Sequence, residues 1–300
     1  LLGLTKACED FNYAVGAQCY VDSDGYYKVT INLAYSNCYD DNINNIISNE
    51  KIKSIEFPYD FCFDWFLCAH TDFNECRFPD KISTLTNLEK LNLESYINML
   101  KDDFALIPKT VKELSISSVS FTKYNFKELS KLTHIKKLSI LRHVFTGEGV
   151  FPIIPKSVKE LTLDKITLTQ DNINEIIKLP NLKKLTFNGT NFDKVIVADD
   201  LTYFKNLKSL VLNNINYFKF DDKSLPENIF KVSKNIKELR ISDTHLNKNN
   251  INEIYSLKKL EILYIEDCHL SEDVVAASKD SLIDFTKFKN LKEFKIDNCK

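Results

Sequence analysis

Ten short segments of the chain alternate apolar and polar residues in the same way. Each reads apolar-x-x-apolar-x-apolar, as in Val158, Leu161 and Leu163 with the polar residues Glu160 and Thr162 between them. Residues two apart lie on one face of a strand, so each segment predicts a short strand with one buried and one solvated face. The segments are centred on Ile55, Leu91, Leu114, Leu138, Leu161, Leu185, Leu210, Leu239, Leu263 and Phe294.

The spacing of these segments indicates an internal repeat. From Leu91 to Leu210 the central residues are 23, 24, 23, 24 and 25 positions apart. One such strand cannot bury its apolar face alone, whereas copies stacked in parallel can, with the returning segments behind them. The pattern therefore predicts an α/β solenoid, an open curved horseshoe with a parallel sheet on its concave face.

Residues 50–300 resemble the leucine-rich repeat family, both in these motifs and in the residues directly after them. The family pattern continues with a small or hydrogen-bonding residue three positions after the strand motif and an apolar residue two positions later. Most copies have a pair of residues at these two positions, such as Thr190 and Phe192. The family's usual Asn at the first position, which hydrogen-bonds backbone between turns, is absent. Residues there that can hydrogen-bond in its place are Thr190, Thr244, Cys268 and Cys299, whereas Val119, Ile166 and Ile215 can only fill space.

The returning segments predict a mixed convex side. Residues 172–179 and 250–254 carry apolar residues at helical spacing. Residues 107–111 and 154–158 each contain a proline before the strand, which favours an extended approach. We therefore expect short helices to alternate with extended segments.

The residues near the two ends of the chain predict what lies on either side of the repeat array. Residues 1–7 are a candidate remnant of a secretory signal, with an ordinary fragment boundary as the alternative. Residues 8–80 are expected to form a cysteine-rich N-terminal cap that includes the first strand motif, and residues 81–300 the repeat array. The last motif ends at Ile296, close to Lys300, so we expect the array to continue beyond it.

Six of the eight cysteines lie in the expected cap: Cys8, Cys19, Cys38, Cys62, Cys68 and Cys76. Extracellular members of the family carry a disulfide-bonded cap at this place, and the resemblance implies the same here. We expect local pairing, of Cys8 with Cys19 or Cys38 and of Cys62 with Cys68 or Cys76, although sequence alone leaves the connectivity open.

Other interpretations of the cysteines stay open. The cap cysteines can be free or buried thiols, and Cys62, Cys68, His70 and Cys76 can be interpreted as four zinc ligands, without the tight C-x-x-C pair of common zinc modules. The last two cysteines, Cys268 and Cys299, occupy the same position of consecutive repeats. Neighbouring strands are close enough for a bridge, but side chains that point the same way favour two thiols.

Composition excludes several classes of function. A net charge of −2 leaves no basic footprint for nucleic acid, and no apolar run approaches the roughly 18 residues that span a membrane. The five histidines are scattered, and no phosphate loop, nucleophile elbow or H-E-x-x-H motif is present. We predict neither enzymatic activity nor a cofactor or metal. Asp22-x-Asp24-Gly25 resembles part of a calcium loop, but strand formers on both sides predict a hairpin turn.

The solvated face of the strands is the predicted binding surface. The residue between the last two apolar positions is small in the middle of the array and becomes Arg240 and Tyr264 near its end, types that are enriched at binding hot spots. A row of lysines precedes the strands, and it predicts either a solvated edge or an electrostatic rim around a partner. Asn188-Gly189-Thr190 is a candidate N-glycosylation site. The predicted ligand-binding residues are Thr186, Val211, Asn213, Arg240, Ser242, Tyr264 and Glu266.

The resemblance implies a non-catalytic protein-recognition module, secreted or at the cell surface, that binds a protein ligand on the concave strand face. A structural, adhesive or carbohydrate-contacting surface protein is the first alternative. An intracellular, cytoplasmic adaptor of the same family, with reduced cysteines, is the second.

Overall fold

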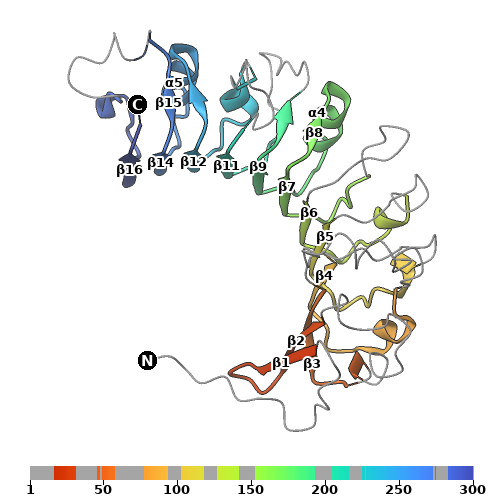
Figure 1. Ribbon diagram of the computed structural model, residues 1–300. Coiled ribbons are helices and arrows are strands. Elements are labelled where there is room, and N and C mark those ends of the chain that lie inside the picture. Colours follow the sequence, from red (N-terminus) through yellow and green to blue (C-terminus); the bar gives the residue numbers. More distant parts are fainter. Residues whose placement is uncertain are drawn as a thin grey trace, which may run out of the picture. The chain divides into compact units, whose positions relative to one another are not determined.

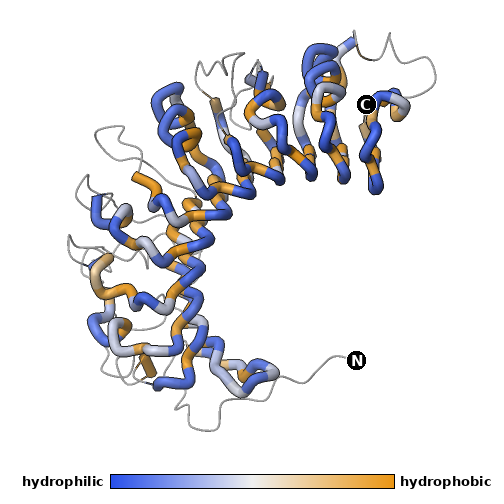
Figure 2. The backbone as a smooth tube through the Cα atoms, turned by 180° about the vertical axis from the view of Figure 1, so that it is seen from behind, coloured by the Kyte–Doolittle hydropathy of each residue, from blue (hydrophilic) through white to orange (hydrophobic). Residues whose placement is uncertain are grey.

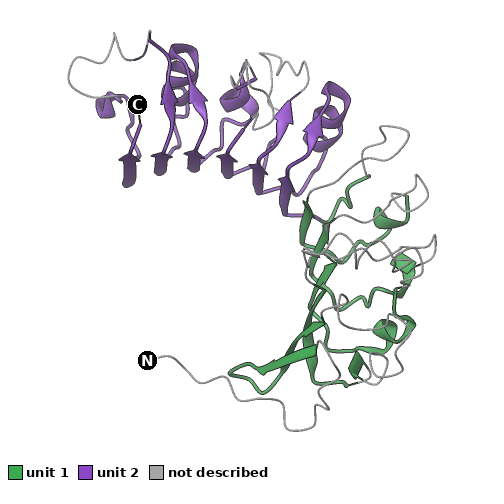
Figure 3. Cartoon of the chain, in the orientation of Figure 1, with its two compact units in different colours: residues 1–157 green, residues 158–300 purple. Residues whose placement is uncertain are grey.

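The strands of the structure coincide with the ten sequence motifs. The structure is a computed structural model, and the chain separates into unit 1, residues 1–157, and unit 2, residues 158–300 (Figure 3). The described residues are 17–31, 46–47, 49–57, 78–93, 103–117, 127–141, 153–192, 204–215, 225–226, 228–272, 274 and 283–299.

Unit 1 begins with an antiparallel hairpin and continues as a parallel sheet. The strands follow one another in sequence order, and β2 pairs in parallel with the first motif strand. Short 3₁₀ helices lie in two of the returns. The elements are β1 (Ala17–Val21), β2 (Tyr27–Ile31), β3 (Ile52–Phe57), η2 (Asp80–Thr84), β4 (Lys90–Leu93), η3 (Asp103–Leu106), β5 (Glu113–Ser117) and β6 (Lys137–Leu141).

Unit 2 repeats the same strand, turn and return. Its motif strands are parallel and again stacked in sequence order, and Figure 1 shows α4 and α5 on one side of this sheet. The motif strands are β7 (Glu160–Asp164), β9 (Lys184–Asn188), β11 (Ser209–Asn213), β12 (Glu238–Ser242), β14 (Ile262–Glu266) and β16 (Glu293–Asp297). The returns hold β8 (Thr167–Leu168), α4 (Gln170–Ile177), β10 (Asn191–Phe192), η4 (Ile229–Val232), β13 (His245–Leu246), α5 (Lys248–Tyr255), β15 (His269–Leu270) and η5 (Phe285–Lys287).

The register stacks equivalent residues of the motifs on one another. Leu161 of β7 lies opposite Leu185 of β9, which lies opposite Leu210 of β11, and the later strands keep the same offset. Apolar and polar residues alternate along the strands (Figure 2). The apolar motif residues form the core between the sheet and the returns, except in β16, where Phe294 is 56% exposed. The polar residues between them are at least partly exposed in most strands. We call this solvated side of the sheet the open face. These features confirm the predicted leucine-rich-repeat solenoid as the fold.

The residue directly after each motif strand of unit 2 has left-handed backbone, with φ between 48° and 57°. After every motif strand of unit 2 but β16, the N–H of this residue donates to the carbonyl at the end of the next motif strand, as in Lys165 to Asn188 at 2.7 Å and Gly189 to Asn213 at 2.8 Å. The turn therefore ends each strand and ties it to its neighbour. Most of the six residues are Asn, Asp or Gly, the types that tolerate this region best. They are Lys165, Gly189, Asn214, Asp243, Asp267 and Asn298.

Thr and Cys side chains replace the asparagine between turns, as the sequence predicted. The Thr190 hydroxyl donates to the carbonyl of Leu163 in the preceding strand at 3.0 Å. The Thr244 hydroxyl accepts from the Ile215 N–H at 3.4 Å.

The Cys268 and Cys299 thiols make the equivalent contacts in the last two turns. The Cys268 sulfur lies 3.8 Å from the Ile241 carbonyl oxygen, and the Cys299 sulfur lies 3.6 Å from that of Ile265. Both cysteines are free, which confirms that this pair forms thiols and not a bridge. Burial raises the pKa of Cys268 to about 12, so this thiol stays protonated.

Replacing Gly189 by Ala is expected to destabilise the fold by about 2 kcal/mol. A Cβ at this position, where φ is +57°, would lie 2.9 Å from Cγ of Lys165. In a Lys165→Ala background the clash is removed, and the cost should fall to about 1 kcal/mol, the left-handed backbone term alone. Urea denaturation of the four proteins measures this difference, and an equal cost in both backgrounds would contradict the steric explanation.

The two predicted helices of the returns are confirmed. α4 and α5 each begin with a reciprocal pair of hydrogen bonds between the residue before the helix and the residue three positions on. In α5, the Asn250 N–H donates to the Asn247 side chain at 2.9 Å and the Asn247 N–H donates to the Asn250 side chain at 3.0 Å. Such capping boxes satisfy backbone donors that a helix start leaves unpaired.

The returns at residues 107–111 and 154–158 each contain a turn where an extended approach was predicted, at residues 109–110 and 156–157. In the first, the Val111 N–H donates to the Pro108 carbonyl at 3.0 Å. The fixed φ of proline suits a turn as well as an extended segment. The hydrogen bond to Val111 therefore decides the conformation.

The predicted hairpin turn at Asp24-Gly25 is confirmed. β1 and β2 are antiparallel, and Gly25 has a φ of +82°. The Asp22 carboxylate accepts hydrogen bonds from the backbone N–H groups of Asp24 and Tyr26, both at 2.9 Å. This carboxylate thus closes the turn, in keeping with the hairpin interpretation of the segment.

Of the six cap cysteines, Cys19 lies among the described residues. It is buried on β1. The other five, and the alternative zinc ligand His70, lie outside the described residues, so the pairing stays a prediction. None of the helices in the described part of the chain combines the length and the apolarity needed to span a membrane.

Candidate functional site

The register of unit 2 brings the predicted open-face residues next to one another. Val211, Arg240 and Tyr264 occupy equivalent positions of β11, β12 and β14, each directly opposite the next. Thr186 of β9 lies opposite Val211, and Lys295 of β16 lies opposite Tyr264. These five side chains, all at least partly exposed, form one continuous line across the strands, which we call the open-face row.

Arg240 and Tyr264 form a stacked pair within the open-face row. The guanidinium carbon of Arg240 lies 4.2 Å from the centroid of the Tyr264 ring. The Arg240 Nε donates to the Glu238 carboxylate at 2.6 Å, and the Tyr264 hydroxyl donates to the Glu293 carboxylate. The hydrogen bond to Glu238 raises the pKa of Arg240, and the hydrogen bond to Glu293 raises the pKa of Tyr264. Both groups therefore keep their protons at neutral pH.

An ion pair continues this arrangement toward β16. The Lys295 ammonium contacts the Glu266 carboxylate and lies 3.6 Å from the Asp297 carboxylate. The hydrogen bond to Glu266 raises the pKa of Lys295. The predicted site residue Glu266 thus lies beside the stacked pair, but its charge is already matched by a lysine of the next strand.

The last residues of the motif strands form a polar ladder. The Asn188 amide donates to the Asp164 carboxylate, the Asn213 amide donates to the Asn188 side-chain oxygen at 2.8 Å, and the Ser242 hydroxyl donates to the Asn213 side-chain oxygen at 2.8 Å. Two predicted ligand-binding residues, Asn213 and Ser242, therefore brace neighbouring strands. This chain of contacts could not be predicted from the sequence, because it depends on the register of four strands.

The candidate glycosylation site lies within this polar ladder. Asn188 is partly exposed, Gly189 has left-handed backbone, and Thr190 is fully buried. Glycosylation of Asn188 stays a prediction. A sugar there would have to be accommodated between the side chains of Asp164 and Asn213.

The predicted lysine row lies just before the motif strands, and part of it is paired with acid. Lys237 contacts the Glu261 carboxylate, and the Lys292 ammonium lies 2.8 Å from the same group. The hydrogen bond from Lys237, followed by that from Lys292, lowers the pKa of Glu261 to about 2. At this end of unit 2 the row is therefore a mixed ionic edge. Its members are Lys112, Lys136, Lys159, Lys183, Lys208, Lys237 and Lys292.

A pH titration tests this pairing. The pKa of Glu261 is lowered on folding, so the pairing contributes stability above about pH 4.5, and this contribution is lost as the pH falls toward 2. Carbon-detected NMR of the carboxyl group is expected to give a midpoint near 2. Replacing Lys237 and Lys292 by Met should move the midpoint up toward 4.5. A wild-type midpoint already near 4.5 would contradict the pairing.

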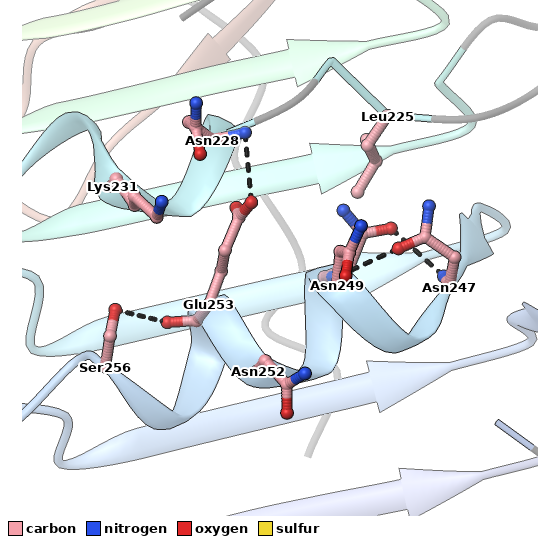
Figure 4. Close-up of a pocket in the computed structure, with 9 residues that line it drawn as sticks. Leu225, Asn228, Lys231, Asn247, Asn249, Asn252, Glu253 and Ser256 are labelled. Atoms are coloured by element: carbon pink, nitrogen blue, oxygen red, sulfur yellow. Dashed lines mark hydrogen bonds between the residues drawn. The ribbon is translucent and has the colours of Figure 1, made fainter. Parts of the chain in front are cut away.

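A polar hollow of about 380 Å³ lies between η4 and α5, on the other side of the sheet from the open-face row. Figure 4 shows Glu253 reaching from α5 to the N-terminus of η4, where its carboxylate accepts from the Asn228 N–H at 3.0 Å. Asn247 belongs to the capping box of α5. These polar groups of the wall already serve helix ends, so we interpret the hollow as part of the scaffold.

The open face of unit 1 has a different character. A shallow hollow of about 280 Å³ there is lined by small and charged side chains, among them Ser115 and Ser139. Glu113 lies 3.1 Å from the Lys90 ammonium and 3.3 Å from that of Lys137. This surface offers matched charges and no aromatic side chain among its lining residues, so the open-face row of unit 2 is the stronger candidate.

Known proteins resemble the chain in fold. Neither a family model nor a curated protein matches the chain. Among solved structures, it is similar to internalin C2 of Listeria monocytogenes, with 19% identity, a TM-score of 0.37 and coverage of 73% of this chain and 74% of that one. It is also similar to the leucine-rich repeat-containing protein LegL7 of Legionella pneumophila, with 13% identity, a TM-score of 0.40 and coverage of 89% and 90%. Neither likeness bears on what this chain binds.

Proposed function

We propose that this chain is a non-catalytic protein-recognition module that binds a protein ligand through the open-face row of unit 2. The stacked pair of Arg240 and Tyr264 is the observation that carries the proposal. Arg and Tyr are the side chains most often found at binding hot spots, together with Trp. Here the two lie in register on neighbouring strands, with a planar cation over an aromatic ring.

The surroundings of the pair favour binding in two ways. Glu238 and Glu293 hold the two side chains in place, so less conformational freedom is lost when a ligand docks. Val211 and Thr186 continue the open-face row with short side chains, which leaves a low surface beside the taller pair. A ligand segment that crosses the strands can lie on this low surface and pack one side chain against Tyr264.

Selection of peptide ligands tests the proposal. Random peptides displayed on phage are selected on the wild-type chain, and the enriched peptides are then assayed against an Arg240→Ala/Tyr264→Ala variant. We expect most of the enriched peptides to lose binding. Asn252→Ala is the matched control, because Asn252 is exposed on α5, away from the sheet. Enriched peptides that bind the double variant as tightly as they bind the wild type would refute this placement.

A pull-down on insoluble polysaccharide, carried out beside the peptide selection, tests carbohydrate binding. If insoluble polysaccharide retains the chain and no peptide is enriched, the adhesive alternative replaces the protein-recognition proposal. Tyr264 is the one aromatic side chain of the open-face row, whereas sugar sites usually need wider stacking surfaces, so we favour a protein ligand.

We further propose that the module works outside the cell or at its surface. The cluster of six cysteines among residues 8–76 supports this, because such clusters form disulfides that persist in oxidising compartments. Mass spectrometry after alkylation without reduction tests it. Six alkylated cysteines among residues 8–76 would favour the intracellular adaptor with reduced thiols instead.

A further inference from the structure

Two histidines that look scattered in the sequence lie side by side in the structure. His245 and His269 are 24 positions apart, which is one repeat, and they face each other in the parallel pair β13–β15. Their ring centroids are 4.9 Å apart, and the ring planes are inclined by 43°. Both residues are exposed, and both lie outside the open-face row.

We propose that His245 and His269 form a binding site for a divalent transition-metal ion of the zinc, nickel and copper class. Imidazole nitrogen is a preferred ligand of these ions. Neighbouring parallel strands place equivalent side chains about 4.8 Å apart and pointing the same way. The repeat thus places two identical ligands side by side on neighbouring strands.

The distance between the rings fits shared coordination. With a metal–nitrogen bond of about 2.0 Å, a ring centroid lies about 3.2 Å from the metal. Two imidazoles then have centroids about 4.5 Å apart at a right angle and about 5.2 Å apart at the tetrahedral angle. The observed 4.9 Å falls between these values. The rings therefore need to rotate toward a common point, but they need not move apart or together.

The backbone beneath the pair is fixed. The His269 N–H donates to the Thr244 carbonyl at 3.0 Å, and the flanking residues Thr244, Leu246 and Cys268 are buried. Adjusting the two side chains therefore leaves the strands in place. The Cys268 thiol is buried, so it does not share the solvent-exposed position of the two imidazoles.

The site supplies two protein ligands. Within the described ranges, no group of three or more His, Cys, Asp or Glu side chains is arranged to hold a metal. Water therefore completes the coordination shell, and the site is open to a further ligand from solvent or from a bound molecule. This proposal does not depend on the proposed function, because the histidines lie away from Arg240 and Tyr264.

Calorimetric titration of the untagged full chain with Ni²⁺ tests the proposal. We expect one bound ion whose affinity is reduced at least ten-fold in His245→Ala and equally in His269→Ala, whatever the cap cysteines and His70 bind in addition. His134→Gln, which removes a histidine of unit 1, and Cys299→Ser, which removes the partly exposed thiol, should leave the affinity unchanged. Loss in only one of the two alanine variants, or in neither, would overturn the shared site.

A spectroscopic measurement makes the test independent of affinity. One equivalent of Cu²⁺ added to the chain in the Cys299→Ser background should give an electron paramagnetic resonance spectrum with nitrogen couplings from two imidazoles. Each single alanine variant should retain coupling from at most one imidazole. A wild-type spectrum with one coupled imidazole would rule out shared coordination, whatever the affinity.

Discussion

Phe187→Ala is expected to destabilise unit 2 by about 3–5 kcal/mol. Phe187 is buried on β9, where it lies between the equivalent core residues of the two neighbouring strands. Its ring contacts that of Phe192 edge-to-face, with centroids 5.2 Å apart. Truncation removes this contact and leaves a cavity in the middle of the stack, where both neighbouring strands hold the walls apart.

Urea denaturation followed by circular dichroism measures the loss in Phe187→Ala. Thr186→Ala is the matched control: it alters the adjacent residue on the open face and should change stability by no more than about 0.5 kcal/mol. Equal effects of the two substitutions would mean that β9 does not have one buried and one solvated face.

Arg240→Ala and Tyr264→Ala are each expected to weaken binding of a selected peptide at least ten-fold. Each substitution removes half of the stacked pair and releases the carboxylate that held it, Glu238 or Glu293. Because the two side chains touch, the double variant should lose less than the product of the single losses. Arg240→Lys should also bind weakly, since an ammonium keeps the charge but not the planar stacking surface.

Surface plasmon resonance with an immobilised peptide measures these effects. The variants should keep wild-type stability, because both side chains lie on the solvated face. Purely multiplicative losses in the double variant would show that the two residues contribute separately, and unchanged affinity in both single variants would remove them from the binding surface.

The strand positions and the core could be predicted from the sequence because burial imposes a strict alternation. Leu161 and Leu163 are fully buried, as their spacing indicated, and so are their equivalents in the other central repeats. The helix at residues 170–177 could also be predicted, since its apolar residues recur at helical spacing. In these segments local pattern and tertiary packing favour the same structure.

The turns after the strands could not be predicted in the same way. Lys165 and Asp243 adopt left-handed backbone although neither is glycine, because the N–H of each is needed to donate to the end of the next strand. Similarly, the turn at Pro108 is settled by one hydrogen bond to Val111. The left-handed turns depend on contacts between neighbouring repeats, which the sequence of one repeat does not contain.

The candidate site could be predicted in part. The positions of Arg240 and Tyr264 on one face follow from the motif, and their juxtaposition follows from the in-register stacking of consecutive repeats. The partners of Arg240 and Tyr264, Glu238 and Glu293, depend on side-chain conformations within and across strands. The strand motif does not indicate the pairing of His245 with His269, because both lie outside it, although one repeat length separates them.

Photo-cross-linking shows directly whether a ligand docks on the open-face row. A benzophenone amino acid at Val211 lies in the open-face row beside Arg240, and the same group at Asn252 lies on α5. We expect a selected peptide to be cross-linked from position 211 and not from position 252. Cross-linking from position 252 alone would contradict it and would place the ligand on the helical side of the sheet.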